Sequence, residues 1–351
     1  MAQISSLQNF SNWNSQTAHD AILATNQRQL IVGNERDTQS AYVIHMAPDP
    51  QDCWSKTYAN GPYDAGFQSI AQLADGTYLC AGYYLASSSS DSQRIWLVNI
   101  DDNGNVLWQK NLEPVGYQAS ASSVVATSDG GFAFTAWMIG SGSDNVSAVY
   151  KFDSKKSLNW QRIVTDVFLY SLRQNPDGSY VASGRNIQSG LNSNPVAVIL
   201  DGSGNVKLKQ VFTSCSVYVL QNTDALRTSD GNYVIAAQAF LVKFNPSGTV
   251  LWQRNVDNGY LSRLATSSKG ELLVGGAIVI GDVNSAYVAL TDSNGLAILW
   301  DDTALFAGSG ACRVMLDSAG RAWAAGNLTN GTLNSMCFLA LFNPVKTLAT
   351  S

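Results

Sequence analysis

Residues 121–137 read ASSVVATSDGGFAFTAW, residues 147–156 read SAVYKFDSKK, and residues 157–164 read SLNWQRIV. This stretch contains four short runs of alternating or continuous apolar residues, separated by turn residues such as the Asp-Gly pair at 129–130. Runs of this kind indicate β-strands, and Asp-Gly turns join consecutive strands antiparallel. The stretch therefore predicts one four-stranded antiparallel sheet.

The same order of runs recurs along the chain. It is clear in SIAQLADGTYLCAGY (69–83) with NVLWQKNL (105–112), and in TDALRTSDGNYVIAAQ (223–238) with TVLWQRNV (249–256). Weaker copies complete a set of seven units with a period of about fifty residues. In every unit a small residue follows the turn residue after six positions: Gln27 and Gly33, Gly76 and Gly82, Gly130 and Ala136, Gly178 and Gly184, Gly231 and Ala237, Gly270 and Gly276, Gly320 and Gly326.

A four-stranded sheet of this size cannot bury both faces alone, whereas sheets stacked around an axis can. We therefore expect an all-β chain forming a single seven-bladed β-propeller with four antiparallel strands per blade. The expected blades cover about residues 14–57, 58–113, 114–165, 166–213, 214–257, 258–306 and 307–351. The last unit has three clear strands, so we expect residues 1–13, with Ala2 to Phe10 as the strand, to close it. Residues 345–350 are the alternative.

Composition agrees with an all-β globular chain and excludes some functions. The 351 residues are 45% hydrophobic and 13% charged, about half the usual ~25% charged share, with Lys+Arg 21 against Asp+Glu 26. The few, scattered basic residues argue against nucleic-acid binding. No apolar run reaches the ~20 residues that span a bilayer, and the N-terminus lacks a basic region followed by an apolar one. We expect neither nucleic-acid partners nor membrane insertion.

Residues that could carry chemistry are sparse. The five cysteines form no C-x-x-C pair and are interpreted as buried apolar residues in a reducing compartment. His19 and His45 are the only histidines, which excludes a metal site built on several histidines, and each is interpreted as structural. No nucleophile elbow, H-E-x-x-H or P-loop motif is present. We therefore assign no catalytic residue, no metal and no cofactor.

Two acidic segments have a structural interpretation. Residues 101–105, DDNGN, resemble the beginning of a calcium loop but lack its twelfth-position Glu, and equivalent segments of other units read as hairpin turns. Asp301 and Asp302 are adjacent, so on a strand they point to opposite faces, and we interpret them as solvated acids.

Aromatic residues recur in the fourth strand of the units. Trp54, Trp108, Trp160 and Trp252 occupy equivalent positions there, with Leu208 replacing Trp in one unit. We expect each to pack the outer strand of one blade against the next blade.

The connections between the second and third strands vary most in length, as in LASSSSDSQ (85–93) and MIGSGSDNV (138–146). In a propeller these connections lie on one face with the crossovers between blades, and loops on a rigid scaffold commonly bind ligands. One position beyond each small residue we expect a ring at the mouth of the central channel, suited to a sugar or a protein surface. Its polar or aromatic members are Asn34, Tyr83, Trp137, Arg185, Gln238 and Asn327, with Ala277 at the seventh position.

Units such as LVNIDDNGNVLWQKNL (97–112) followed by SVVATSDGGFAFTAW (123–137) resemble the propeller repeats of bacterial surface proteins and of bacteriophage tail-associated proteins. The W-containing outer strand also looks similar to that of quinoprotein dehydrogenases, but no cofactor-binding set can be transferred, and sialidase-type Asp-boxes are not matched. Propellers host many unrelated functions, so the resemblance implies fold more than activity.

Three functions remain open. The first is a non-enzymatic virion structural or host-recognition protein, tail- or fibre-associated, with other virion or surface proteins and a cell-surface glycan as partners. It would be assembled in the host cytoplasm and reside in the virion. The second is a soluble lectin-like propeller, cytoplasmic or extracellular. The third is a hydrolase or lactonase with one site at the central channel.

Overall fold

The computed structural model describes residues 3–9, 16–25, 28–47, 49–142, 144–187, 192–215, 217–218, 223–281, 283–295, 297–304, 310–317, 319–329 and 335–343. Their regular structure is β-strand, apart from short 3-10 turns such as η2 (Pro50–Asp52) and η3 (Ser90–Ser92). Among these residues there is no helix with the length and apolar character needed to cross a bilayer.

The described strands form seven four-stranded antiparallel sheets, which we number as blades in chain order. Blades 1 to 3 are β2 (Gln16–Leu23), β3 (Gln29–Glu35), β4 (Ser40–Met46) and β5 (Trp54–Tyr58); β6 (Ala65–Gln72), β7 (Tyr78–Leu85), β8 (Gln93–Ile100) and β9 (Val106–Leu112); and β10 (Tyr117–Ala126), β11 (Phe132–Gly140), β12 (Asn145–Phe152) and β13 (Leu158–Thr165).

Blades 4 to 6 follow the same order. They are β14 (Val167–Gln174), β15 (Tyr180–Asn186), β17 (Pro195–Leu200) and β18 (Val206–Val211); β20 (Thr223–Arg227), β21 (Tyr233–Ala237), β22 (Phe240–Phe244) and β23 (Val250–Asn255); and β24 (Gly259–Thr266), β25 (Leu272–Ile280), β26 (Val283–Thr291) and β27 (Ile298–Ala304). A separate two-stranded ribbon joins β16 (Asn192–Ser193) to β19 (Val217–Tyr218).

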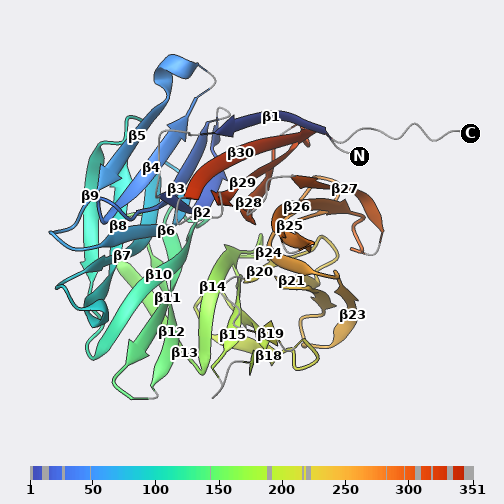
Figure 1. Cartoon of the computed structure of the whole chain (residues 1–351). Coiled ribbons are helices and arrows are strands. Elements are labelled where there is room, and N and C mark those ends of the chain that lie inside the picture. The colour runs from blue at the N-terminus through green and yellow to red at the C-terminus, as the bar shows by residue number, and fades with distance from the viewer. Residues whose placement is uncertain are drawn as a thin grey trace, which may run out of the picture.

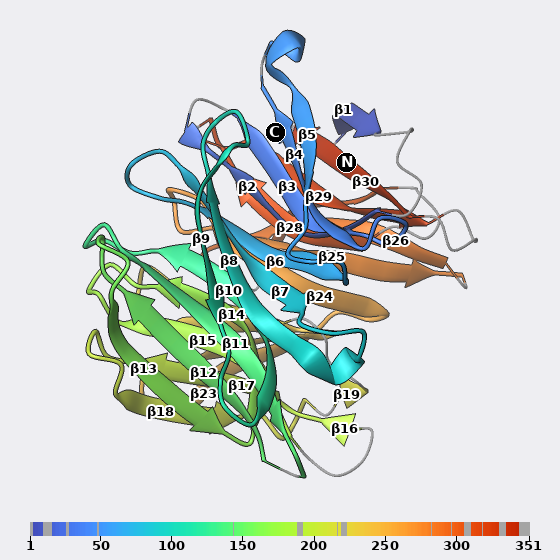
Figure 2. The same cartoon turned by 90° about the vertical axis from the view of Figure 1, so that its left-hand side faces the viewer.

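The description of the chain as seven repeats needs a correction. Only six blades are complete repeats, each built from four strands of one continuous stretch of chain. The seventh sheet has three strands of its own, β28 (Gly310–Leu316), β29 (Ala322–Thr329) and β30 (Ser335–Asn343), and its fourth strand is β1 (Gln3–Asn9) from the N-terminal end. Figures 1 and 2 both show β1, in dark blue, beside the red β30.

This composite sheet closes the ring because it joins the two ends of the chain by backbone hydrogen bonds. Residues 345–350, the alternative closing segment, lie outside the described residues. Each blade contributes its first strand to the centre, and each of these strands contacts the first strands of both neighbouring blades: β2, β6, β10, β14, β20, β24 and β28, with β28 returning to β2.

The hydrophobic core lies between blades. One cluster, for example, joins Leu79 and Leu97 of blade 2 to Phe134 and Phe152 of blade 3. The second and third strands are buried on both faces, which explains their continuous apolar runs. The outermost strands alternate between exposed and half-buried residues, as in β9 and β13.

The repeated tryptophans pack neighbouring blades together, as the sequence predicts. Trp54 Nε1 donates to the carbonyl oxygen of Asp102 in the next blade at 2.9 Å. Gly104 has φ +74°, and a Cβ there would stand 2.7 Å from the Trp54 ring, so the turn needs glycine. Two residues after this tryptophan, Lys56 Nζ donates to the carbonyl oxygen of Asn103 in the same turn at 2.6 Å.

Candidate functional site

The predicted mouth ring occupies equivalent places, at or near the ends of the second strands. Every member is half-buried, and the register pairs Asn34 with Thr17, Tyr83 with Gly66, Trp137 with Ser120, and Arg185 with Phe168. This end of the blades carries the connections between second and third strands. Because the ring residues share the same register in their blades and are all half-buried, they lie at one level of the propeller. A binding role for the ring stays a prediction.

Two members of this ring have structural partners. The Asn327 side chain pairs with the backbone of Ala18, accepting from its N–H at 2.7 Å and donating to its carbonyl oxygen at 2.8 Å. This contact links blade 7 to blade 1. Arg185 donates to the Tyr170 hydroxyl at 2.8 Å and to Ser193 Oγ at 3.0 Å.

Other members are also engaged. The Tyr83 hydroxyl donates to Asp64 Oδ2 at 2.9 Å, and burial together with that carboxylate raises the pKa of Tyr83. The Asn34 side-chain oxygen lies 2.8 Å from His19 Nε2. Gln238 has φ +48° and forms a β-bridge with Leu261 of blade 6. Much of the predicted ring therefore stabilises the scaffold.

A polar groove lies beside this ring, between blades 2 and 3. Its volume is about 360 Å³, and its lining includes Asp91, Arg94, Tyr117, Gln118 and Gly140. These residues flank the two long connections that the sequence singles out. The half-buried Tyr117 offers an aromatic surface, while the side chains of Asp91, Arg94 and Gln118 offer hydrogen-bond donors and acceptors.

One wall of the groove is held by its own hydrogen bonds. Ser92 Oγ donates toward the carbonyl oxygens of Ser87 and Ser89, at 3.0 and 2.6 Å, and accepts from the Ser87 N–H at 3.0 Å. The serine-rich connection is therefore a compact turn, which positions Asp91 at the groove.

A second site lies at the centre of the propeller, where the sequence analysis assigns nothing. In six blades the pairing between first and second strands has a β-bulge at the same register, for example between Ala18 and Asp20 or between Phe67 and Ser69. The residue after the bulge is polar in every case, and β20 has a polar residue at the equivalent place. We call this set the channel ring: Asp20, Ser69, Ser123, Ser171, Asp224, Arg263 and Arg313.

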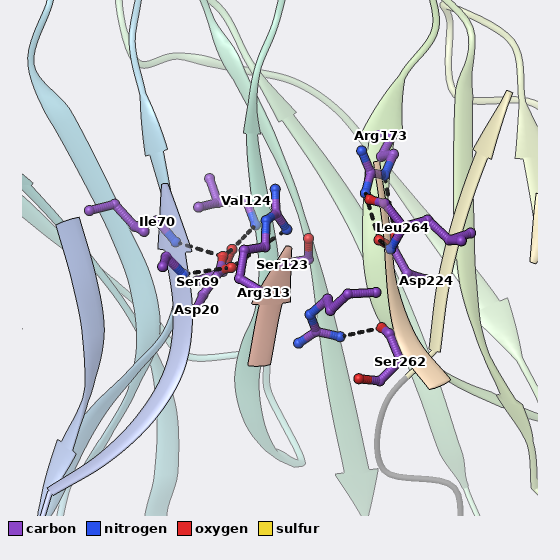
Figure 3. A network of polar contacts seen from close by, with 12 residues as sticks. Asp20, Ser69, Ile70, Ser123, Val124, Arg173, Asp224, Ser262, Leu264 and Arg313 are labelled. Carbon is purple, nitrogen blue, oxygen red and sulfur yellow. Dashed lines mark hydrogen bonds and ion pairs between the residues drawn. The ribbon is translucent and has the colours of Figure 1, made fainter. Parts of the chain in front are cut away.

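The acceptors of the channel ring connect consecutive blades. Asp20 Oδ2 accepts from the backbone N–H of Ile70 at 3.3 Å, and Ser69 Oγ accepts from that of Val124 at 3.1 Å. Ser123 Oγ accepts from the N–H of Leu172 at 3.2 Å. Ser69 Oγ also donates to Asp20 Oδ2 at 2.8 Å (Figure 3).

One set of hydrogen bonds in this region spans three blades. Arg173 of β14 donates to Asp224 of β20 through Nε at 3.2 Å and Nη2 at 2.5 Å, and to the carbonyl oxygen of Leu264 in β24 at 2.5 Å. Asp224 Oδ2 also accepts from the Leu264 N–H at 3.0 Å (Figure 3). Burial alone would raise the pKa of Asp224, but the Arg173 guanidinium, together with the more distant charges of Arg313 and Arg263, holds that pKa below its usual value.

Unlike Arg173, Arg263 and Arg313 are members of the channel ring. Arg313 reaches Asp20 Oδ1 at 3.5 Å, and Arg263 donates to the carbonyl oxygen of Ser262 at 2.8 Å. Both also lower the pKa of Asp224 through space. A cavity of about 320 Å³ opens here, lined by polar residues of blades 3, 4, 5 and 7: Ser123, Ser171, Arg173, Asp224 and Arg313.

A sequence signal for the channel ring exists. Each member stands seven positions before the turn residue of its unit, as Ser69 precedes Gly76 and Arg263 precedes Gly270. This column is polar in all seven units although it lies within an apolar run. Because the surrounding run is apolar, a single polar position within it does not stand out in any one unit.

The remaining candidates have structural places. Burial lowers the pKa of His19 and of His45, whose ring stacks on Trp54 at 5.0 Å between centroids. Asp101 accepts from the backbone N–H groups of Asn103 and Asn105 at 2.9 and 2.8 Å, so this segment is a hairpin turn as predicted. Among the described residues no group of three or more His, Cys, Asp or Glu could hold a metal ion.

Comparison with known proteins supports the fold. No protein-family model matches the sequence, and comparison with curated proteins gives no match. Solved structures do match: the WD40 β-propeller domain of Doa1 at TM-score 0.63 and 12% identity, covering 100% of this chain and 99% of that one. Kuenenia stuttgartiensis hydrazine synthase matches at TM-score 0.58 and 15% identity, covering 92% of this chain and 95% of that one.

Trypanosoma rangeli sialidase, solved with the inhibitor DANA, is also similar, at TM-score 0.58 and 9% identity. The match covers 96% of this chain and 58% of the sialidase. These proteins differ in function, and similarity at such low sequence identity indicates a shared fold but not a shared function. The chain is an all-β single propeller with four antiparallel strands per blade, similar in fold to enzymes and non-enzymes alike.

Proposed function

We propose that this protein is a non-enzymatic recognition module that binds a cell-surface glycan through the groove between blades 2 and 3. The observation that carries the proposal is the placement of Tyr117, Arg94, Asp91 and Gln118 around one open cavity of about 360 Å³. The proposal uses no catalytic residue and no cofactor.

The chemistry of the groove suits a sugar. A sugar ring has an apolar face that can pack on an aromatic side chain, and hydroxyls that need both donors and acceptors. Tyr117 provides the aromatic surface, Arg94 provides donors, and Asp91 and Gln118 provide acceptors. Volumes of about 300–1,000 Å³ are typical of small-ligand sites, so the groove is large enough for a short saccharide.

The setting that we propose is a virion, with the propeller tail- or fibre-associated and held by other virion proteins. This part rests on the resemblance of the repeats to phage tail-associated propellers. Several copies in one particle would turn weak binding by each groove into firm attachment. A soluble lectin-like propeller is the second candidate, since the same groove would serve a free protein.

The test compares wild type with Arg94→Ala and Tyr117→Ala on a glycan array and on whole bacterial cells. Lys207→Ala is the matched control, because Lys207 lies on the outer strand β18 of blade 4 and its side chain is 60% exposed. We expect both groove variants to lose binding and the control to keep it. The melting temperature of Arg94→Ala should be unchanged, and that of Tyr117→Ala should fall slightly, because Tyr117 also packs on the core between blades 2 and 3. Equal binding by all four proteins, or none by any of them, would contradict the groove proposal.

A second pair of variants separates the groove from the mouth ring. Tyr83→Ala combined with Trp137→Ala alters the predicted ring while leaving Arg94 and Tyr117 in place. Loss of binding only in this double variant would move the recognition site to the channel mouth. Copurification with other virion proteins from infected cells would distinguish the virion setting from a soluble lectin.

A further inference from the structure

We propose that the central channel contains a second binding site, independent of the groove, for a small hydroxylated monocarboxylate. The site consists of the Arg313 guanidinium and the Ser123 hydroxyl, facing the cavity of about 320 Å³ that Arg173, Asp224 and Ser171 complete.

Most members of the channel ring share one hydrogen bond. In blades 1, 2, 3 and 5 the ring member is a serine or aspartate that accepts a backbone N–H from the next blade. An arginine has no acceptor and cannot make this bond. Arg263 and Arg313 therefore depart from the rule that stabilises the ring, and departures of this kind concentrate at functional sites.

The missing bond between blades 7 and 1 is replaced locally. The N–H of Ala21, which a serine or aspartate in place of Arg313 would bind, instead donates to Asp20 Oδ1 at 2.9 Å. Asp20 Oδ2 already accepts from Ser69 Oγ and from the Ile70 N–H. The Asp20 carboxylate therefore accepts three hydrogen bonds that do not involve Arg313. Arg313 Nη1 lies 3.5 Å from Asp20 Oδ1, which is a long contact.

The charges around the cavity do not balance. Arg173, Arg263 and Arg313 carry three positive charges and Asp20 with Asp224 carry two negative ones, so the interacting set has one positive charge in excess. Arg173 is committed to Asp224 by two hydrogen bonds. Arg313, with its side chain 30% exposed, has the donors to spare for a ligand and lines the cavity.

The groups at the cavity favour one class of ligand. A guanidinium presents paired N–H donors whose spacing fits the two oxygens of a carboxylate. One excess charge balances a monocarboxylate, whereas a phosphate of about −1.5 to −2 charge would meet uncompensated repulsion from the two aspartates. Ser123 Oγ accepts from the Leu172 N–H, so its hydroxyl hydrogen is available to a ligand hydroxyl.

The experiment is a calorimetric titration of the full chain with sodium gluconate, a hydroxylated monocarboxylate, and in parallel with sodium phosphate. Wild type is compared with Arg313→Gln, which removes the positive charge, and with Arg313→Lys, which keeps the charge but loses the paired N–H donors of the guanidinium. Arg162→Gln is the control, because Arg162 lies on the outer strand β13, where it donates to the carbonyl oxygen of Gly204 in a turn of the next blade.

We expect wild type and the control to bind gluconate alike, Arg313→Gln to bind at least about tenfold more weakly, and Arg313→Lys to lie between them. The lysine variant keeps the test decisive if the glutamine variant fails to fold. The proposal is overturned if wild type does not bind gluconate, if Arg313 variants bind it as wild type does, or if phosphate binds more tightly.

Discussion

Replacing Asp224 by asparagine should destabilise the propeller more than any exposed charge replacement. The Asp224 side chain is 3% exposed and holds Arg173 through two hydrogen bonds and the Leu264 N–H through a third. Asparagine keeps the size and one oxygen acceptor but leaves the Arg173 charge without its partner. Removing one member of a buried pair costs about 3–5 kcal/mol, and we expect the free energy of unfolding to fall by that amount.

The measurement is urea unfolding followed by tryptophan fluorescence, on wild type, Asp224→Asn, Arg173→Met and the double variant. The double variant should recover part of the loss, because it removes both charges together. Asp166→Asn is the control: Asp166 is 78% exposed and lies 3.7 Å from Lys209 Nζ, and exposed pairs contribute at most about 1 kcal/mol. A loss at Asp224 no larger than at Asp166, or additive single effects, would refute the reasoning.

The same pair predicts a dependence on pH. Arg173 holds the pKa of Asp224 below its unfolded value of about 3.9, so the pair stabilises the folded state fully above that pH. Its contribution is lost as the pH falls through the lowered pKa. The difference in stability between wild type and Asp224→Asn should therefore be constant near neutral pH and shrink in acid.

Two smaller predictions concern glycines and histidines. Gly204→Ala should lower the melting temperature more than Gly178→Ala does. Both glycines have φ near +80°, but a Cβ at Gly204 would stand 2.6 Å from the Trp160 ring, whereas a Cβ at Gly178 would have nothing within 4 Å. Equal losses in melting temperature would contradict a packing role for the Gly204 turn. Burial lowers the pKa of His19 and of His45, so the free energy of unfolding of the wild type should fall as the pH drops below about 6.5. A variant with glutamine at both positions should lose less free energy of unfolding between about pH 7 and 5. An equal loss in the variant and the wild type would contradict this.

The repeating unit, the strands and the places of the tryptophans follow from the amino-acid sequence. These features are local or periodic: an apolar run between Asp-Gly turns specifies a hairpin, and Trp54 stands at the same position of its unit as Trp108. The expectation that the N-terminal segment joins the last sheet also follows from the sequence, because the last unit has only three runs. The repeat leaves open whether the first residues or residues 345–350 supply the fourth strand, and the pairing of β1 with β30 answers this.

The tertiary structure alone decided what the polar residues do. Arg173, Asp224 and Leu264 belong to three blades and meet only because the ring closes. The same closure pairs Asn327 with Ala18, so a predicted ligand-binding residue is also a link between the first and last blades. A charge or an amide has no fixed partner in a sequence; its role depends on which groups the fold places within hydrogen-bond distance, and those groups come from distant blades.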